Sequence, residues 1–261
     1  MKFFSDKRIF VLVCLNLVLY IIILILDIRI ASGFSQTPLF LDGVFKYPAI
    51  ISCLLICLFT FSHSRKEAAR IQAVVFCFTL GADFFLLFTD YFAAGVFVFL
   101  GAHICALIRY RKQWLLPVGI GAAALFIIII LLQQKLFHTN PDVALTSALC
   151  FAYGALIISV TVSTFFAFQP RTNTIFSRLG MLLFLVCDVN VLIYNLFPPV
   201  GGLYTVSIVL MWAFYLPAQT LLALSATDFT VHRVSNDRVS SLRGTARECV
   251  AERGNPEKPH Y

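Results

Sequence analysis

The sequence predicts an all-α membrane protein: a polytopic bundle of about eight transmembrane helices with both termini in the cytoplasm. Three observations predict it. The chain is 60% hydrophobic and only 13% charged, whereas a soluble domain usually carries about 25% charged residues. Apolar runs long enough to cross a bilayer, roughly 17–25 residues each, recur along almost the whole chain. Basic residues collect on one side of these runs.

Eight apolar runs account for most of the chain. They cover residues 8–27, 44–62, 70–89, 92–108, 114–132, 143–168, 175–197 and 203–226. A transmembrane β-barrel would instead show segments of about 10 residues in which apolar and polar side chains alternate. The first run is longer than the apolar stretch of a signal peptide, about 7–15 residues, so we expect it to be retained as the first helix.

Lysine and arginine side chains predict the orientation. Of the 20 basic residues, 17 lie before the first run, after every second run, or in the C-terminal tail. We expect the other three, Arg29, Lys46 and Lys135, on the opposite side of the membrane. Because cytoplasmic loops carry the excess of Lys and Arg, both termini are predicted to be cytoplasmic. The net charge of +7 then reflects topology and attraction to anionic lipids.

Composition divides the chain into two regions. Residues 1–226 form the predicted bundle, and residues 227–261 form a polar, basic tail that we expect to be disordered in the cytoplasm. The loops are too short to build a nucleic-acid-binding surface, so the bilayer is the expected partner and nucleic acid is not. Seven of the eight cysteines fall inside apolar runs and none in an outer loop, so no disulfide framework is indicated. The oligomeric state is left open.

Two aspartates interrupt the apolar runs. Asp83 lies in "FCFTLGADFFLLFTDYF" and Asp188 in "FLVCDVNVLIYNLF". An aspartate at the centre of a transmembrane helix costs roughly 2.5–3.5 kcal/mol, and such residues usually face the bundle interior and have a function. Each lies seven to nine residues from the outer end of its run, or roughly 10–14 Å at 1.5 Å per residue. We therefore expect the two carboxyl groups at one depth, where they could meet.

Other polar residues fall near that level and are candidates for orienting a substrate or water. They are His103, Asn190, Asn195, Tyr215 and Gln219. Tyr215 and Gln219 are four positions apart and share a helix face. An ordinary role as polar contacts between helices is the alternative for each of these residues, since such contacts are common in membrane bundles.

Several blocks of the sequence together resemble a known family. "ADFFLLF", "FLGAH", "RLGMLLFLVCDVNVLIYN" and "WAFYLPAQTLLALS" are similar to blocks of the YhhN/lysoplasmalogenase family, and Lys46-Tyr47-Pro48 resembles the entry to its second helix. The resemblance extends from about Lys46 to Ser225. Many members have Gly before the first aspartate and Ser before the second, where this chain has Ala82 and Cys187. These two variants resemble a bacterial branch of the family.

The resemblance implies a bundle of about eight helices that hydrolyses the vinyl ether bond of lysoplasmalogens. The products would be a fatty aldehyde and a glycerophospho-amine, and the substrate partner a lysophospholipid in a bacterial plasma membrane. The family's paired acids match Asp83 and Asp188, and its other polar positions match His103, Tyr215 and Gln219. It implies no cofactor. No metal is expected either, because catalytic zinc typically keeps three protein ligands and His103 is the one histidine deep in an apolar run.

The chemistry of vinyl ether hydrolysis suits a pair of carboxyl groups. A proton must reach the β-carbon, and water must add to the resulting oxocarbenium-like cation, as in two-carboxylate glycosidases. Two carboxyl groups in a low-dielectric site can hold one proton between them. We expect Asp83 to be the acid and Asp188 the ionised partner, or the reverse. A proton-coupled transporter and a receptor-like or structural bundle are the alternative functions.

Overall fold

The computed structural model describes residues 7–33, 39–60, 66–167, 171–196 and 201–227, and the regular structure of these residues is helical throughout. In chain order the helices are α1 (Lys7–Ala31), α2 (Leu39–Thr60), α3 (Lys66–Phe88), α4 (Phe92–Arg111), the 3-10 turn η1 (Lys112–Trp114), α5 (Leu115–Lys135), α6 (Pro141–Phe165), α7 (Arg171–Leu196) and α8 (Gly202–Leu224). The eight α-helices of the described residues begin and end within a few residues of the predicted runs, so the predicted fold class is confirmed.

Seven stretches of the described helices are long and apolar enough to cross a membrane. One of them, Phe92–Lys135, has 44 residues and contains α4, η1 and α5. A single helix of that length would extend about 66 Å at 1.5 Å per residue, about twice the hydrocarbon thickness of a bilayer. The 3-10 turn η1 divides this stretch into two helices, each long enough to cross the membrane once. The chain is therefore an integral, multi-pass membrane protein.

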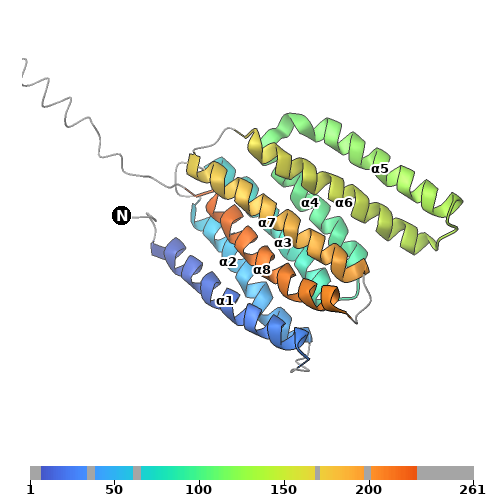
Figure 1. Cartoon of the computed structure of the whole chain (residues 1–261). Helices are drawn as coiled ribbons and strands as arrows, with labels where there is room; N and C mark the ends of the chain where they lie inside the picture. The colour runs from blue at the N-terminus through green and yellow to red at the C-terminus, as the bar shows by residue number, and fades with distance from the viewer. Residues whose placement is uncertain (1–6, 34–38, 61–65, 168–170, 197–200, 228–261) are drawn as a thin grey trace, which may run out of the picture. The chain divides into compact units, whose positions relative to one another are not determined.

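The helices differ in how many neighbours they have (Figure 1). α7 packs most extensively against α8, and α3 against α4, while α6 contacts both α4 and α7. α1 packs on α2 and α8, and α5 packs almost entirely on α6. α1 and α5 therefore lie at opposite edges of the bundle, with the other six α-helices between them.

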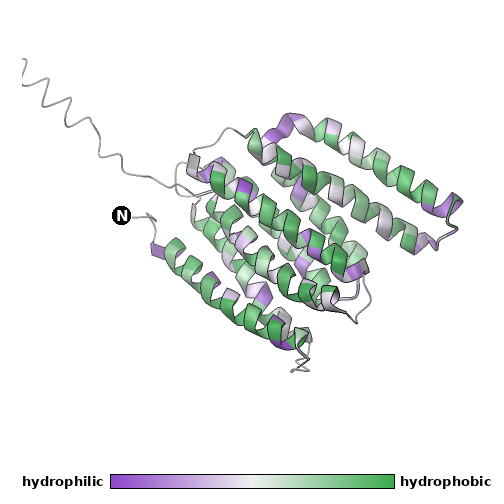
Figure 2. Cartoon of the chain, in the orientation of Figure 1, coloured by the Kyte–Doolittle hydropathy of each residue, from purple (hydrophilic) through white to green (hydrophobic). Residues whose placement is uncertain are grey.

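Figure 2 shows that hydrophobic residues predominate along the helices. Each of the eight α-helices carries large hydrophobic residues that are exposed, for example Ile21 on α1, Phe97 on α4 and Leu192 on α7. α5 has no buried residue at all. Such extensive apolar surface would be a liability in water and fits contact with lipid chains.

Two glycines allow close contact in the two most tightly packed helix pairs. A Cβ on Gly95 of α4 would lie 2.7 Å from the Leu86 side chain of α3. A Cβ on Gly180 of α7 would lie 2.9 Å from the Leu222 side chain and 3.1 Å from the Ala218 carbonyl oxygen, both on α8. Small residues at such crossings let helix backbones approach closely in membranes. The glycines thus set the spacing of the helices that carry the two aspartates.

Lys46 lies inside α2, because this helix begins at Leu39, five residues before the predicted run 44–62. Lys46 is buried, and its Nζ lies 2.9 Å from Oδ1 of Asp27 on α1. A lysine can be buried at this position because the aspartate compensates its charge. The predicted tail, apart from Thr227, lies outside the described residues.

Candidate active site

Asp83 is held by a tyrosine from the other half of the chain. Its carboxyl group projects from α3 and is 4% exposed. The hydroxyl of Tyr215 on α8 donates to it and lies 2.9 Å from Oδ1 and 2.8 Å from Oδ2. This contact orients the carboxyl group within a buried environment.

Asp188 forms a second pair of the same kind. Its Oδ2 accepts a hydrogen bond of 2.6 Å from the hydroxyl of Tyr153 on α6. Both Asp188 and Tyr153 are half-buried, in contrast to the buried Asp83 and Tyr215. The hydrogen bonds that the two carboxyl groups make to described residues therefore go to two different tyrosines. Asp188 is the more accessible of the two acids.

Aromatic rings join the two aspartate–tyrosine pairs into one cluster. The Phe184 ring of α7 lies between them, with its centroid 5.5 Å from that of Tyr215 and 5.3 Å from that of His103. The His103 ring in turn lies 5.1 Å from that of Tyr153. Such edge and tilted contacts stabilise ring pairs by about 0.5–1.5 kcal/mol beyond their area burial. The two acids thus border one shared aromatic cluster formed by α4, α6, α7 and α8.

His103 is buried at 2% exposure and has one ring nitrogen engaged. Its Nδ1 lies 3.1 Å from the carbonyl oxygen of Phe99 on the same helix. Its Nε2 is buried and has no hydrogen-bond partner among the described residues. Buried polar atoms nearly always find a partner, so this nitrogen marks a place where a ligand or water is expected.

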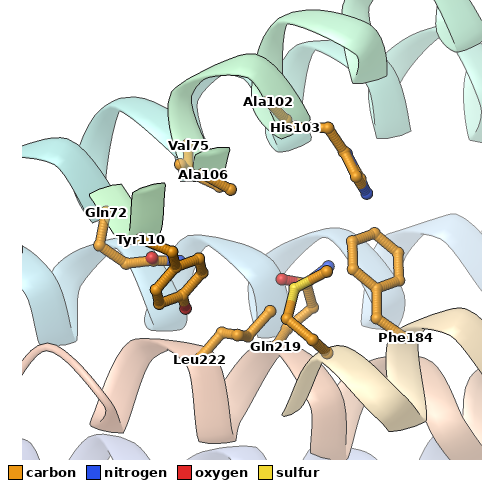
Figure 3. Close-up of a pocket in the computed structure, with 10 residues that line it drawn as sticks. Gln72, Val75, Ala102, His103, Ala106, Tyr110, Phe184, Gln219 and Leu222 are labelled. Carbon is orange, nitrogen blue, oxygen red and sulfur yellow. The ribbon is translucent and has the colours of Figure 1, made fainter. Parts of the chain in front are cut away.

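Gln219 is in a similar situation one turn away from Tyr215. It is 1% exposed, and its side-chain Nε2 is buried without a hydrogen-bond partner among the described residues. His103 and Gln219 line the same small cavity, which is shown in Figure 3. The structure therefore brings together five of the candidate residues: Asp83, Asp188, His103, Tyr215 and Gln219.

The two asparagines are placed differently. Asn190 is buried but its Nδ2 donates to the carbonyl oxygen of Val186, 2.8 Å away on the same helix. Asn195 is exposed, and its Nδ2 donates to the carbonyl oxygen of Val191, also on its own helix. Neither side chain makes a hydrogen bond to an aspartate in the described part of the chain.

Tyr153 was not among the residues expected from the sequence. It lies in "CFAYGALII", where a single tyrosine in an apolar run gives little signal. Tyr153 could have been found from the need of a buried tyrosine hydroxyl for a hydrogen-bond partner. Asp188 is an acceptor at a comparable predicted depth in the membrane.

The buried ion pair between Lys46 and Asp27 is the second unexpected feature. Lys46 Nζ also lies 4.9 Å from the centroid of the Trp212 ring, and that ring lies 5.0 Å from the ring of Tyr215. The positive charge is thus one aromatic residue away from the tyrosine that binds Asp83. An ion pair among apolar helices could have been sought in the sequence, because both partners stand within or beside apolar runs.

Metal ligands do not gather around these acids. Within the residues that the structure describes, no three His, Cys, Asp or Glu side chains form a group that could hold a metal ion. The site is therefore a set of carboxyl, hydroxyl, imidazole and amide groups. Such groups can transfer protons and orient polar molecules.

Fold and site together define an integral membrane protein whose helical bundle encloses two tyrosine-bound carboxyl groups. The model of the YhhN family matches residues 43–226. The chain therefore belongs to the YhhN family, as the resemblance predicted. α1 and the C-terminal tail lie outside the matched residues. No curated protein and no solved structure matches the chain.

Proposed function

We propose that this protein is a lysoplasmalogenase-type hydrolase of the plasma membrane, acting on the vinyl ether bond of alkenyl lysophospholipids. The observation that carries the proposal is the pair of intramembrane carboxyl groups, Asp83 and Asp188, each bound by a tyrosine and bordering one aromatic cluster. Membership of the YhhN family, which includes hydrolases, supports the reaction class. The products are a fatty aldehyde and a glycerophospho-amine.

The reaction begins with proton transfer to carbon. The carboxylic acid of Asp83 gives its proton to the β-carbon of the vinyl ether, and the α-carbon becomes an oxocarbenium-like cation. The carboxylate of Asp188 stabilises that charge, as the second carboxylate does in glycosidases. The aromatic rings of Phe184 and Tyr215 add negative π faces near the cation.

Water completes the reaction. A water molecule adds to the cation and loses a proton to the carboxylate of Asp188, forming a hemiacetal. The hemiacetal collapses to the aldehyde and the free glycerol hydroxyl, with the proton of its own hydroxyl passing to the leaving oxygen. The proton that Asp188 took from water replaces the one that Asp83 gave to carbon, so the pair of acids again holds one proton. His103 and Gln219 orient the water, because each has a buried nitrogen without a hydrogen-bond partner among the described residues. No cofactor is needed for this balance.

Access from the bilayer fits a lipid substrate. Asp188 and Tyr153 are half-buried at a position where the outside of the bundle is covered by exposed apolar side chains, such as Val189 and Phe151. A lipid could therefore reach this acid from the side, with its chain in the hydrocarbon. The buried Asp83 would meet the substrate only after it has entered the aromatic cluster.

The test is aldehyde release by the purified full-length protein in detergent, given a 1-alkenyl lysophospholipid. We expect release by the wild type and none by Asp83→Asn or Asp188→Asn, each with an unchanged elution profile. Asp90→Asn is the matched control, because Asp90 is exposed at the end of α3. A saturated 1-alkyl lysophospholipid should not react, since it has no double bond to protonate.

Two outcomes would contradict the proposal. Wild-type rates in either aspartate variant would show that the acids have no catalytic role. Absence of aldehyde with folded wild-type protein would show that the substrate is wrong. Asp83-dependent uptake of a solute into liposomes would then favour the proton-coupled transporter, since intramembrane acids also serve as proton relays.

A further inference from the structure

A small cavity lies beside the aromatic cluster, on the side of the predicted cytoplasmic helix ends. Its volume is about 10 Å³, about the size that holds one water molecule. Side chains of α3, α4, α7 and α8 surround it, among them Gln72, His103, Ala106, Tyr110, Met181 and Gln219. Most of this lining is apolar, so its few polar atoms are informative.

Two polar atoms of the lining have complementary hydrogen-bonding roles. Nδ1 of His103 faces the carbonyl oxygen of Phe99 at 3.1 Å, so it carries the hydrogen and, in the neutral ring, Nε2 is an acceptor. Nε2 of Gln219 is a donor. Both atoms are buried without a partner among the described residues. In Figure 3 the two side chains reach the cavity from opposite sides. An acceptor and a donor that face one cavity match the two hydrogen-bonding roles of water, which both donates and accepts.

Polar side chains continue from the cavity to the cytoplasmic end of the bundle. Gln72 and Tyr110 line its far end. The guanidinium of Arg109 donates to Gln72 Oε1, to the Tyr110 hydroxyl at 3.2 Å and to Ser225 Oγ at 2.9 Å. Arg109 stands in the last turn of α4, and Ser225 directly follows α8.

On its other side the cavity is lined by Phe184 and His103, whose rings contact the two tyrosines that bind the acids. The His103 ring contacts the ring of Tyr153, whose hydroxyl binds Asp188. Gln219 stands four residues after Tyr215, whose hydroxyl binds Asp83. The cavity therefore lies between the two acids and the polar group around Arg109.

We propose that this cavity is a water site and that water enters the bundle through it from the cytoplasmic end, past Gln72, Tyr110 and Arg109. The role of this water in catalysis rests on the proposed function, in which water is the second substrate of the hydrolysis. Lipid would then reach the acids from the bilayer, while water reaches them from the opposite direction. Water at this position gives both nitrogens the hydrogen-bond partner that buried polar atoms need.

Met181 makes the cavity testable without any assay of hydrolysis. It is 2% exposed and lines the cavity. X-ray radiolysis of water forms hydroxyl radicals in place, and these convert a neighbouring methionine to its sulfoxide. Met211 of α8 does not line the cavity and serves as the internal reference. We expect Met181 in the purified wild-type protein to be oxidised readily despite its burial.

Ala106→Leu is the variant that fills the cavity. We expect the ratio of Met181 to Met211 oxidation to fall about fivefold or more, because the added side chain takes the volume of one water molecule. Ala124→Leu, the same change at an exposed position of α5, should leave the ratio unchanged. Ala102→Val provides a smaller filling change if Ala106→Leu does not fold.

The outcomes separate the two proposals. The water site would be overturned if Met181 stays unoxidised in the wild type, or if it is oxidised equally in folded Ala106→Leu. Either result counts whether or not aldehyde is released. Oxidation of Met181 that depends on the cavity, without aldehyde release, would support the water site and contradict the proposed reaction. If both proposals hold, Ala106→Leu should lower kcat for hydrolysis with little change in KM.

Discussion

The hydroxyl of Tyr215 donates to both carboxylate oxygens of Asp83, at 2.9 and 2.8 Å, from a position 132 residues further along the chain. The backbones of α3 and α8 make few or no close contacts, so the long tyrosine side chain bridges the space between them. This contact positions the buried acid. It can be removed without changing the size of the side chain appreciably.

Tyr215→Phe should lower kcat/KM roughly 10- to 100-fold, because Asp83 becomes a carboxylate as it gives up its proton, and a lost hydrogen bond to a charged group corresponds to about 1.5–3 kcal/mol. Aldehyde release by the variant measures the effect. The control is Tyr91→Phe, since Tyr91 is 71% exposed. An unchanged rate in Tyr215→Phe would show that the hydroxyl does not position the reacting carboxyl group.

Lys46→Met should destabilise the folded protein by about 3–5 kcal/mol, because it leaves the buried carboxylate of Asp27 without the charge of its lysine. The double variant Asp27→Leu, Lys46→Met should recover most of this loss. Thermal unfolding in detergent measures both. Lys135→Met is the control, since Lys135 is exposed at the end of α5. Equal loss in the single and double variants would argue against a charge effect.

Gly180→Ala should destabilise the bundle by about 1–3 kcal/mol, the usual cost of overpacking. Its new Cβ would lie 3.1 Å from the Ala218 carbonyl oxygen, a backbone atom that cannot rotate away. The matched change Gly119→Ala on α5 meets no atom within 4 Å and should be neutral or stabilising, because alanine favours helix. A melting temperature that falls equally in both variants would contradict the close packing of α7 on α8.

Hydrolysis in D₂O should place one deuterium on the aldehyde carbon next to the carbonyl group. That carbon is the former β-carbon, which receives the proton from the acid in the rate-limiting step, so the reaction should also be slower than in H₂O. Mass spectrometry of the aldehyde at early times measures the incorporation. Aldehyde incubated in D₂O without enzyme corrects for exchange. Product without deuterium would exclude carbon protonation by a solvent-exchanged acid.

The acids of the site could be found in the sequence because of their cost. A carboxyl group within an apolar run is expensive in a bilayer, so Asp83 and Asp188 stand out without any structure. Tyr153 does not, because a tyrosine is tolerated in a transmembrane helix wherever its hydroxyl finds a partner. Asn195 was a candidate because of its predicted depth, but the sequence does not show that its side chain binds a backbone carbonyl oxygen of its own helix.

The sequence by itself determined that the chain crosses the membrane repeatedly, where its helices lie to within about five residues, and that two carboxyl groups lie deep within them. These properties depend on local composition, since every backbone group in a bilayer must be satisfied within its own helix. Only the tertiary structure decided that each acid meets a tyrosine, that Lys46 pairs with Asp27, and that His103 and Gln219 share one cavity. Those contacts join residues far apart in the chain, and their formation depends on how side chains pack in the space between the helices.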